Sequence, residues 1–188
     1  STFPKPPNIE LCYRGEPLLN KKIVGIVQYA TDNNVPTTIV TNATLLTPEL
    51  TDNLINAGLK GIYFSIDGAT EETYMKIRHG SDYNRVVENV EYFLKKNKET
   101  KNIFTWIKTV DMDINKSEQM DIVNQWLERG IDGVIIQNLS IRGNDDYALW
   151  YNAKSLENLK NNRYPCHLLW NNSTIATSGN VSSCITFF

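Results

Sequence analysis

Several short apolar runs in this chain are followed by polar side chains of a kind that can hold a ligand. Gly15, Glu16 and Pro17 come after the run Ile9–Tyr13. A glycine lets backbone approach a bound group closely, and a proline ends a strand because it has no N–H to donate. Glu16 is thereby placed at a strand end, where its carboxylate can accept hydrogen bonds from a ligand's ammonium or hydroxyl groups. A surface turn with an exposed glutamate is the alternative that this tripeptide leaves open.

Four further polar sets occupy equivalent positions after apolar or β-branched runs. They are Thr41-Asn42, Ser65-Ile66-Asp67, Thr109-Val110-Asp111 and Gln137-Asn138. If the strands are parallel, their carboxyl ends meet at one edge of the sheet, where α/β proteins bind ligands. Each residue alone is more often a strand-end cap than a ligand contact. Their shared edge favours a site for a polar molecule that carries hydroxyl groups and an amine.

The apolar spacing predicts alternating strands and helices. The predicted strands are Ile9–Tyr13, Val35–Asn42, Gly61–Asp67, Asn102–Val110 and Asp132–Leu139, with the first of them buried. The predicted helices are Lys21–Asn33, Pro48–Ala57, Thr70–Ile77, Tyr83–Lys96 and Ser117–Glu128, with Asn20, Thr47 and Ser117 as N-caps. Short loops and near-continuous apolar strands indicate parallel strands joined by right-handed crossovers. The predicted fold class is α/β, a partial (β/α) TIM-like barrel. No Gly-x-Gly-x-x-Gly follows any strand, so no dinucleotide site is expected.

Composition excludes several classes of function. The net charge of -2 provides no basic excess for nucleic acid, and no apolar run is long enough to span a membrane, so neither is an expected partner. The three cysteines, Cys12, Cys166 and Cys184, are too scattered for a secreted disulfide scaffold, which favours a reducing, cytoplasmic setting. With only His79 and His167, a zinc hydrolase is not expected, although a ligand role for His167 stays open.

A change in composition after Ile141 predicts a second region. Gly, Asn, Asp, Tyr and Trp replace the earlier alternation, which places a boundary near Asn144 and divides the chain into 1–143 and 144–188. The second region is expected to hold a weak helix at Lys154–Lys160 and a hairpin at Ser173–Cys184. The chain begins with Ser1 and ends on apolar residues, which predicts truncation at both ends.

Three blocks of the sequence resemble the radical S-adenosylmethionine (radical SAM) enzymes, in particular the branch with a C-terminal SPASM-type extension. The blocks are Gly15–Leu19, Thr41–Leu46 and Ser65–Tyr74 followed by Ile77-Arg78. Pro165-Cys166, Trp170 and Cys184 resemble the opening of the extension, whose cysteines bind an auxiliary iron–sulfur cluster. The likeness covers nearly the whole chain. Ser178-Gly179 stands where the extension has an Asp-Gly turn, and this is a departure from its pattern.

The resemblance implies that S-adenosylmethionine lies across the strand ends. It implies that Gly15-Glu16-Pro17 holds the methionyl amine, that Ser65 and Asp67 contact the ribose or the methionyl part, and that Arg78 binds the carboxylate. Asn42 and Gln137 are further implied contacts. In the family, a reduced [4Fe-4S] cluster splits S-adenosylmethionine into a 5′-deoxyadenosyl radical that abstracts hydrogen from a substrate. The implied partners are a peptide, protein or small-molecule substrate and an electron donor such as flavodoxin or ferredoxin.

One departure from the family concerns the reactive cluster. Family members bind it through Cys-x-x-x-Cys-x-x-Cys after the first strand, upstream of the Gly-Glu-Pro block. This chain has no such motif, and Cys12 is expected to be a small buried apolar residue. Either the first strand and cysteine loop precede Ser1 in a longer protein, or the chain is a degenerate homologue.

Three hypotheses for function remain open from the sequence. In the first, the full protein is a radical SAM oxidoreductase or maturase, with Cys166 and Cys184 as ligands of an auxiliary cluster. In the second, a degenerate cluster-free barrel binds S-adenosylmethionine or a peptide, and the two cysteines are unpaired structural residues. The third is a cluster-free lyase or aldolase, for which Lys108 is the strand-end lysine.

Overall fold

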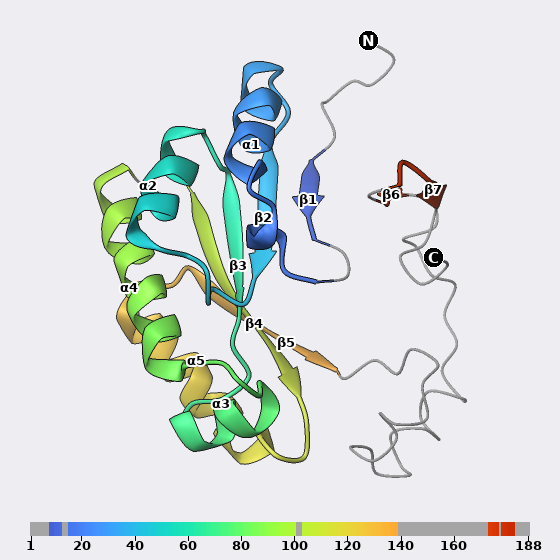
Figure 1. Ribbon diagram of the computed structural model, residues 1–188. Helices are drawn as coiled ribbons and strands as arrows, with labels where there is room; N and C mark the ends of the chain where they lie inside the picture. Colours follow the sequence, from blue (N-terminus) through green and yellow to red (C-terminus); the bar gives the residue numbers. More distant parts are fainter. Residues whose placement is uncertain (1–7, 13–14, 101–102, 139–172, 177, 183–188) are drawn as a thin grey trace. The chain divides into compact units, whose positions relative to one another are not determined.

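Five parallel strands form the sheet around which the chain folds. The computed structural model describes residues 8–12, 15–100, 103–138, 173–176 and 178–182. The strands are β1 (Ile9–Leu11), β2 (Thr37–Thr41), β3 (Gly61–Ser65), β4 (Phe104–Asp111) and β5 (Gly133–Asn138). They lie in the order β1-β2-β3-β4-β5, and every neighbouring pair is parallel (Figure 1). Spatial order that follows chain order is the arrangement of a barrel wall, and the predicted fold class is confirmed.

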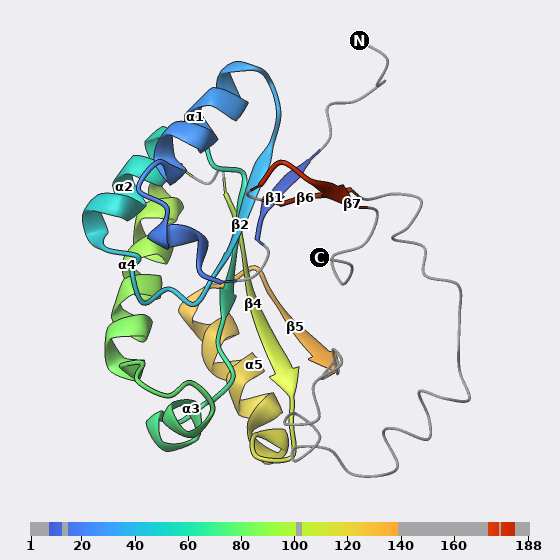
Figure 2. The same ribbon diagram turned by 45° about the vertical axis from the view of Figure 1, so that its right-hand side comes forward.

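The helices lie on one side of this sheet (Figures 1 and 2). They are η1 (Pro17–Leu19), α1 (Ile23–Asp32), α2 (Pro48–Asn56), α3 (Glu71–Ile77), α4 (Tyr83–Thr100), η2 (Lys116–Glu118) and α5 (Gln119–Arg129). Ile39, Phe64 and Ile107 are fully buried in the core that these helices cover. Alternate strand residues point the other way, onto the face opposite the helices, which we call the open face. Tyr63 and Lys108 lie on this face and are half-buried.

An aromatic ring fills the amino-terminal part of the open face. Phe104 pairs with Gly61 across β3 and β4, and its ring packs edge-on against Tyr63 with centroids 5.7 Å apart. A Cβ on Gly61 would lie 2.1 Å from the Phe104 ring, so only glycine leaves room for the ring in this position. The ring therefore covers the start of β3 on this face.

The predicted cap at the start of α2 is confirmed. The Thr47 hydroxyl accepts from the Leu50 amide at 3.2 Å and caps α2, and Gly130 ends α5 with a φ of 93°. Two predicted caps are wrong. Asn20 ends the proline-led turn η1, and α1 starts at Ile23. Ser117 lies inside η2, because a 3-10 turn precedes α5.

The prediction that the first strand is buried is also wrong. Ile9 is 41% exposed, and β1 pairs with β2 alone among the strands described. An edge strand leaves one side without a neighbour, which explains the exposure. Cys12 follows this strand and is half-buried rather than buried.

The chain divides into two compact units, residues 1–138 and 139–188. In the second, β6 (Thr174–Ile175) and β7 (Val181–Ser182) form an antiparallel hairpin, as predicted for this stretch. The predicted boundary near Asn144 and helix Lys154–Lys160 lie outside the described residues. No helix in the described ranges is long and apolar enough to cross a membrane.

The connection from β3 to α3 packs directly against the helix that it leads to. A Cβ on Gly68 would lie 2.5 Å from the backbone nitrogen of Tyr74 and 2.8 Å from its Cα. Because backbone cannot move aside as a side chain can, Gly68→Ala is expected to lower the free energy of unfolding by about 1–3 kcal/mol.

Chemical denaturation followed by circular dichroism measures this effect. Gly25→Ala is the matched control, since Gly25 is exposed within α1 with no heavy atom within 4 Å of an added Cβ. It should raise stability by up to about 1 kcal/mol. Equal effects from the two substitutions would contradict the close packing of Gly68 on α3.

Candidate functional site

The parallel sheet brings the predicted ligand residues to one edge. We call this edge the rim: the carboxyl ends of β1 to β5, the loops that follow them, and Arg78 at the end of α3. Glu16 follows β1, Asn42 follows β2, and Asp67 follows β3, while Ser65 and Gln137 lie in β3 and β5. The shared edge inferred from the sequence is thus confirmed by strand direction.

Glu16 joins the loop after β1 to the end of β2. Its carboxylate accepts from the Thr41 hydroxyl at 2.6 Å, the Asn42 amide at 2.8 Å and the Leu18 amide at 3.0 Å. The alternative of a free surface glutamate is therefore wrong. A carboxylate offers about four acceptor positions, so three protein donors leave capacity for one more.

The loop after β2 is held in a strained conformation. Ala43 is fully buried with a φ of 59°, in the left-handed region that non-glycine residues rarely adopt. The Asn89 amide donates to its carbonyl at 2.8 Å, and the Asn42 side-chain oxygen accepts from the Thr44 amide at 3.0 Å. The bond from Thr44 fixes the side-chain oxygen of Asn42 toward its own loop. The Asn42 NH₂ group donates to none of the residues the structure describes, so it remains a donor for a ligand.

Asp67 is the most heavily bonded residue of the rim. Its side chain accepts from Arg78 Nε at 2.9 Å, from Arg78 Nη2 at 2.6 Å and from the Val110 amide at 2.8 Å. Asp67 is only 3% exposed, whereas the Arg78 side chain is 27% exposed. Three protein donors therefore hold this buried carboxylate. Arg78 is oriented by it, with its Nη1 unbonded among the described residues.

Asn115, which the sequence reasoning missed, holds this part of the rim. The fully buried Asn115 donates to the Asp67 carbonyl at 2.7 Å and to the Val110 carbonyl at 2.9 Å. Its own carbonyl accepts from the Met112 amide at 2.9 Å. Asn115 therefore ties the end of β4 to the connection that follows β3.

Glu118 caps α3 from a distant part of the chain. Its carboxylate accepts from the Ala69 amide at 2.9 Å and from the hydroxyls of Thr70 and Thr73. Burial by itself would raise the pKa of Glu118, but the hydrogen bonds from Thr73, Ala69 and Thr70 outweigh it and hold the pKa below its usual value. A negative charge at a helix amino terminus is also favoured by the helix dipole.

The comparisons with known proteins agree with this geometry. The family model for the Radical SAM superfamily matches residues 11–120, which is more than half of the chain. The chain belongs to the Radical SAM superfamily. It is therefore a member of a superfamily of enzymes that use S-adenosylmethionine and a [4Fe-4S] cluster.

Similar proteins in this superfamily differ in what they act on. The chain is 42% identical over 64 residues to the AdoMet-dependent heme synthase of Methanosarcina barkeri, covering 34% of this chain and 18% of the relative. It is 30% identical over 129 residues to the GTP 3′,8-cyclase of Clostridium acetobutylicum, covering 68% of this chain and 39% of the relative. The chain thus spans less than half the length of either relative.

Among solved structures, Streptococcus suis SuiB bound to precursor peptide SuiA is similar in fold. The TM-score is 0.64 at 19% identity, covering 82% of this chain and 34% of that chain. At this identity the likeness extends to the fold alone.

The residues of this chain fit one of the superfamily's two cofactors. The rim offers an acceptor position on Glu16, a hydroxyl on Ser65 and a cation on Arg78, which match the amine, ribose and carboxylate of S-adenosylmethionine. The ligand motif of the reactive cluster, Cys-x-x-x-Cys-x-x-Cys, is absent from the printed sequence. Among the described residues, no group of three His, Cys, Asp or Glu could hold a metal. Cys166 and Cys184 lie outside those ranges.

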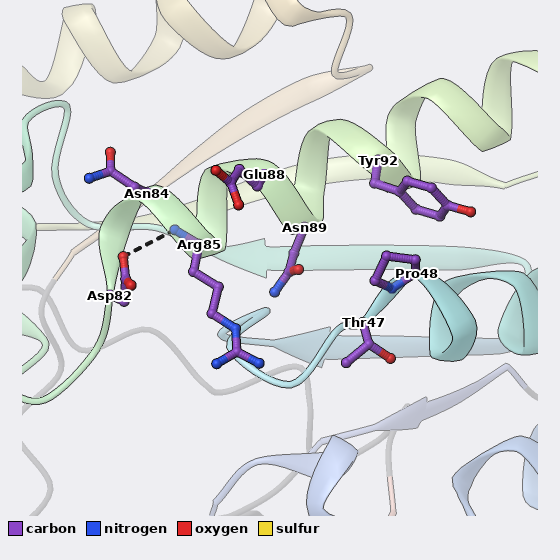
Figure 3. A pocket seen from close by; sticks show the side chains of 8 residues that line it. All are labelled: Thr47, Pro48, Asp82, Asn84, Arg85, Glu88, Asn89 and Tyr92. Carbon is purple, nitrogen blue, oxygen red and sulfur yellow. Dashed lines mark hydrogen bonds between the residues drawn. The ribbon is translucent and has the colours of Figure 1, made fainter.

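A separate hollow of about 580 Å³ lies in the helix layer (Figure 3). It is bordered by Thr47 at the start of α2 and by the first turns of α4, where Asp82 accepts from the Arg85 amide at 3.1 Å. Glu88, Asn89 and the other lining side chains are mostly polar (Figure 3). No predicted cofactor residue lines this hollow, so it is distinct from the rim.

The capping of α3 by Glu118 predicts a pH-dependent stability. Because the pKa of Glu118 is lowered in the folded protein, its contribution is fully present above the unfolded value near 4.3 and is lost as pH falls through the folded value. Glu118→Gln is expected to lower the free energy of unfolding by about 1–2 kcal/mol at pH 7. The difference from wild type should shrink below about pH 4.

Urea unfolding measured from pH 3 to pH 8 tests this prediction. Glu128→Gln is the matched control, since Glu128 is exposed on α5 and has no hydrogen bond or ion pair to another described residue. The control should follow wild type at every pH. A Glu118→Gln effect that stayed constant down to pH 3 would rule out the capping carboxylate as its source.

Proposed function

We propose that this chain is the central part of a longer radical SAM enzyme that binds S-adenosylmethionine at the rim and abstracts hydrogen from a substrate. The observation that carries the proposal is the arrangement of Glu16 and Arg78. Protein donors hold the Glu16 carboxylate, and Asp67 holds the Arg78 guanidinium, so both side chains are ordered without a ligand, which supports their use as ligand contacts. Membership of the superfamily supplies the identity of that ligand.

Each predicted cofactor residue takes a role that agrees with its contacts. The Gly15-Glu16-Pro17 segment receives the methionyl amine through the remaining acceptor position of Glu16. Arg78 binds the methionyl carboxylate, and the Asp67 carboxylate, which Arg78 and Val110 already occupy, contributes by orienting Arg78. Ser65 donates to the ribose, and the side-chain amides of Asn42 and Gln137 are further donors at the rim.

The cluster and its extension belong to the longer protein in this proposal. Reduction of the bound [4Fe-4S] cluster supplies the electron that divides S-adenosylmethionine, and its cysteines lie outside these 188 residues. Cys166 and Cys184 are ligands of an auxiliary cluster in a SPASM-type extension. The greater length of the curated relatives supports this arrangement. An electron donor such as flavodoxin or ferredoxin and a cytoplasmic setting complete the proposal.

A peptide is the substrate class we favour. The support is the likeness in fold to SuiB, which was solved with its precursor peptide. A small molecule is the alternative, which the names of the sequence relatives support. A cluster-free binding module is the second candidate function, and the absence of Cys-x-x-x-Cys-x-x-Cys from this chain favours it.

Anaerobic assay of the full-length protein tests the proposal. After reconstitution with iron and sulfide, dithionite-reduced protein should convert S-adenosylmethionine to 5′-deoxyadenosine, detected by liquid chromatography. Glu16→Gln is expected to lower the rate at limiting S-adenosylmethionine by about tenfold or more, since it removes a charged acceptor.

Glu49→Gln serves as the matched control, because Glu49 is exposed in the first turn of α2. Its rate should equal that of wild type. Binding of S-adenosylmethionine by calorimetry without any 5′-deoxyadenosine would favour the binding module. Absence of both binding and cleavage would exclude both candidates.

A further inference from the structure

We propose that Lys108 is a binding site on the open face for an acidic group, a carboxylate or a phosphate, of the enzyme's substrate. Glu10 and Tyr63 hold the lysine until that group binds. The proposal rests on the proposed function only in taking the open face as the place where the substrate lies.

Lys108 lies next to the rim without belonging to the cofactor residues proposed above. It pairs in register with Ser65 across β3 and β4, so the two side chains are neighbours on the open face. Two residues further along β4, the Val110 amide contacts Asp67. The ammonium of Lys108 is therefore at the depth where a substrate would meet bound S-adenosylmethionine.

The ammonium of Lys108 is partly desolvated and has no hydrogen bond to another residue that the structure describes. Its Nζ lies 4.1 Å from the centroid of the Tyr63 ring and 3.7 Å from Glu10 Oε2. The Lys108 side chain is 18% exposed. A distance of 3.7 Å exceeds the usual hydrogen-bond range of about 2.7–3.2 Å. Among the residues described, the three donors of this ammonium have no acceptor, although a lysine removed from water gains much from one.

Glu10 is suited to give way to an incoming anion. It lies in β1 and Lys108 in β4, three strands apart, or at least about 14 Å across a flat sheet with a strand spacing of about 4.8 Å. The two side chains meet because the sheet curls toward the open face. Glu10 is 47% exposed, so its carboxylate can return to water when an anion takes its place.

The surrounding groups select for negative charge on the ligand. The Ser65 hydroxyl has no hydrogen-bond partner in the described ranges and lies beside Lys108 as a second donor. Burial raises the pKa of Tyr63, and the nearby Glu10 carboxylate raises it further, so the phenol stays protonated and keeps its hydroxyl as a third donor. A cation beside two hydroxyl groups is the chemistry that binds carboxylate or phosphate oxygens.

Anion binding to the full-length protein tests the proposal by calorimetry. The probes are tripolyphosphate and glutarate, with neutral glutaramide as the uncharged control. We expect at least one anion to bind wild type. Lys108→Met should weaken that binding about tenfold or more, because it removes the cation. Glu10→Gln should strengthen it severalfold, because the competing carboxylate is gone. Lys95→Met, at an exposed position on α4, should leave it unchanged.

The outcomes separate this proposal from the proposed function. In Lys108→Met, the affinity for S-adenosylmethionine and the rate of 5′-deoxyadenosine formation without substrate should fall much less than the affinity for the anion. The anion that binds, glutarate or tripolyphosphate, identifies the acidic group as carboxylate or phosphate. Binding of neither anion would overturn the proposal, and so would binding insensitive to Lys108→Met or weakened by Glu10→Gln. Glu10→Gln keeps the test decisive if Lys108→Met fails to fold.

Discussion

The buried carboxylate of Asp67 is the constraint on which the rim depends. A carboxylate that is 3% exposed is tolerated only if its oxygens are paired, since an unpaired buried charge costs several kcal/mol. The pairing comes from Arg78 at the end of α3 and from the Val110 amide in β4. Asn115 adds a bond to the Asp67 carbonyl. The Asp67 side chain therefore joins the residue that follows β3 to the end of α3 and to β4.

Glu16 joins neighbouring strand ends in the same way at β1 and β2. Its bonds to Thr41 and Asn42 join the first two strand ends, as Asp67 joins the third and fourth. Both carboxylates are held largely by protein donors, so the rim is shaped before any ligand arrives. A ligand that meets ordered groups loses less conformational entropy on binding. In the proposed function, the groups left to bind it are the remaining acceptor position of Glu16, the cation of Arg78, the hydroxyl of Ser65 and the side-chain amides of Asn42 and Gln137.

The sequence predicted those features of the fold that depend on local patterns. Alternating apolar runs identified the five strands, and Thr47-Pro48 identified the start of α2, because strand pleat and helix capping act over a few residues. The strand direction then followed from the alternation, and the shared rim followed from the direction. Local patterns misled at Asn20 and Ser117, where 3-10 turns took the residues expected to cap α-helices.

The long-range contacts were beyond the reach of local patterns. Asn115 and Glu118 lie at the start of a helical segment whose sequence has no unusual feature. Their partners, Asp67 and Ala69, are more than forty residues away in the chain. Lys108 was visible only as a strand-end lysine, since its contacts with Glu10 and Tyr63 depend on the curl of the sheet. Sequence spacing does not indicate which residues on different strands come into contact until the strand order is known.

Amide hydrogen exchange in the ligand-free protein tests most directly whether the rim is held in place before a ligand binds. The amides of Asn42, Ala69 and Val110 donate to the carboxylates of Glu16, Glu118 and Asp67. Slow exchange is expected at all three amides, comparable to that of the central strands, and protection of the Val110 amide should be lost in Asp67→Ala, which removes the side-chain acceptor. Exchange at the rates of open loops in wild-type protein would contradict a rim that is assembled in advance.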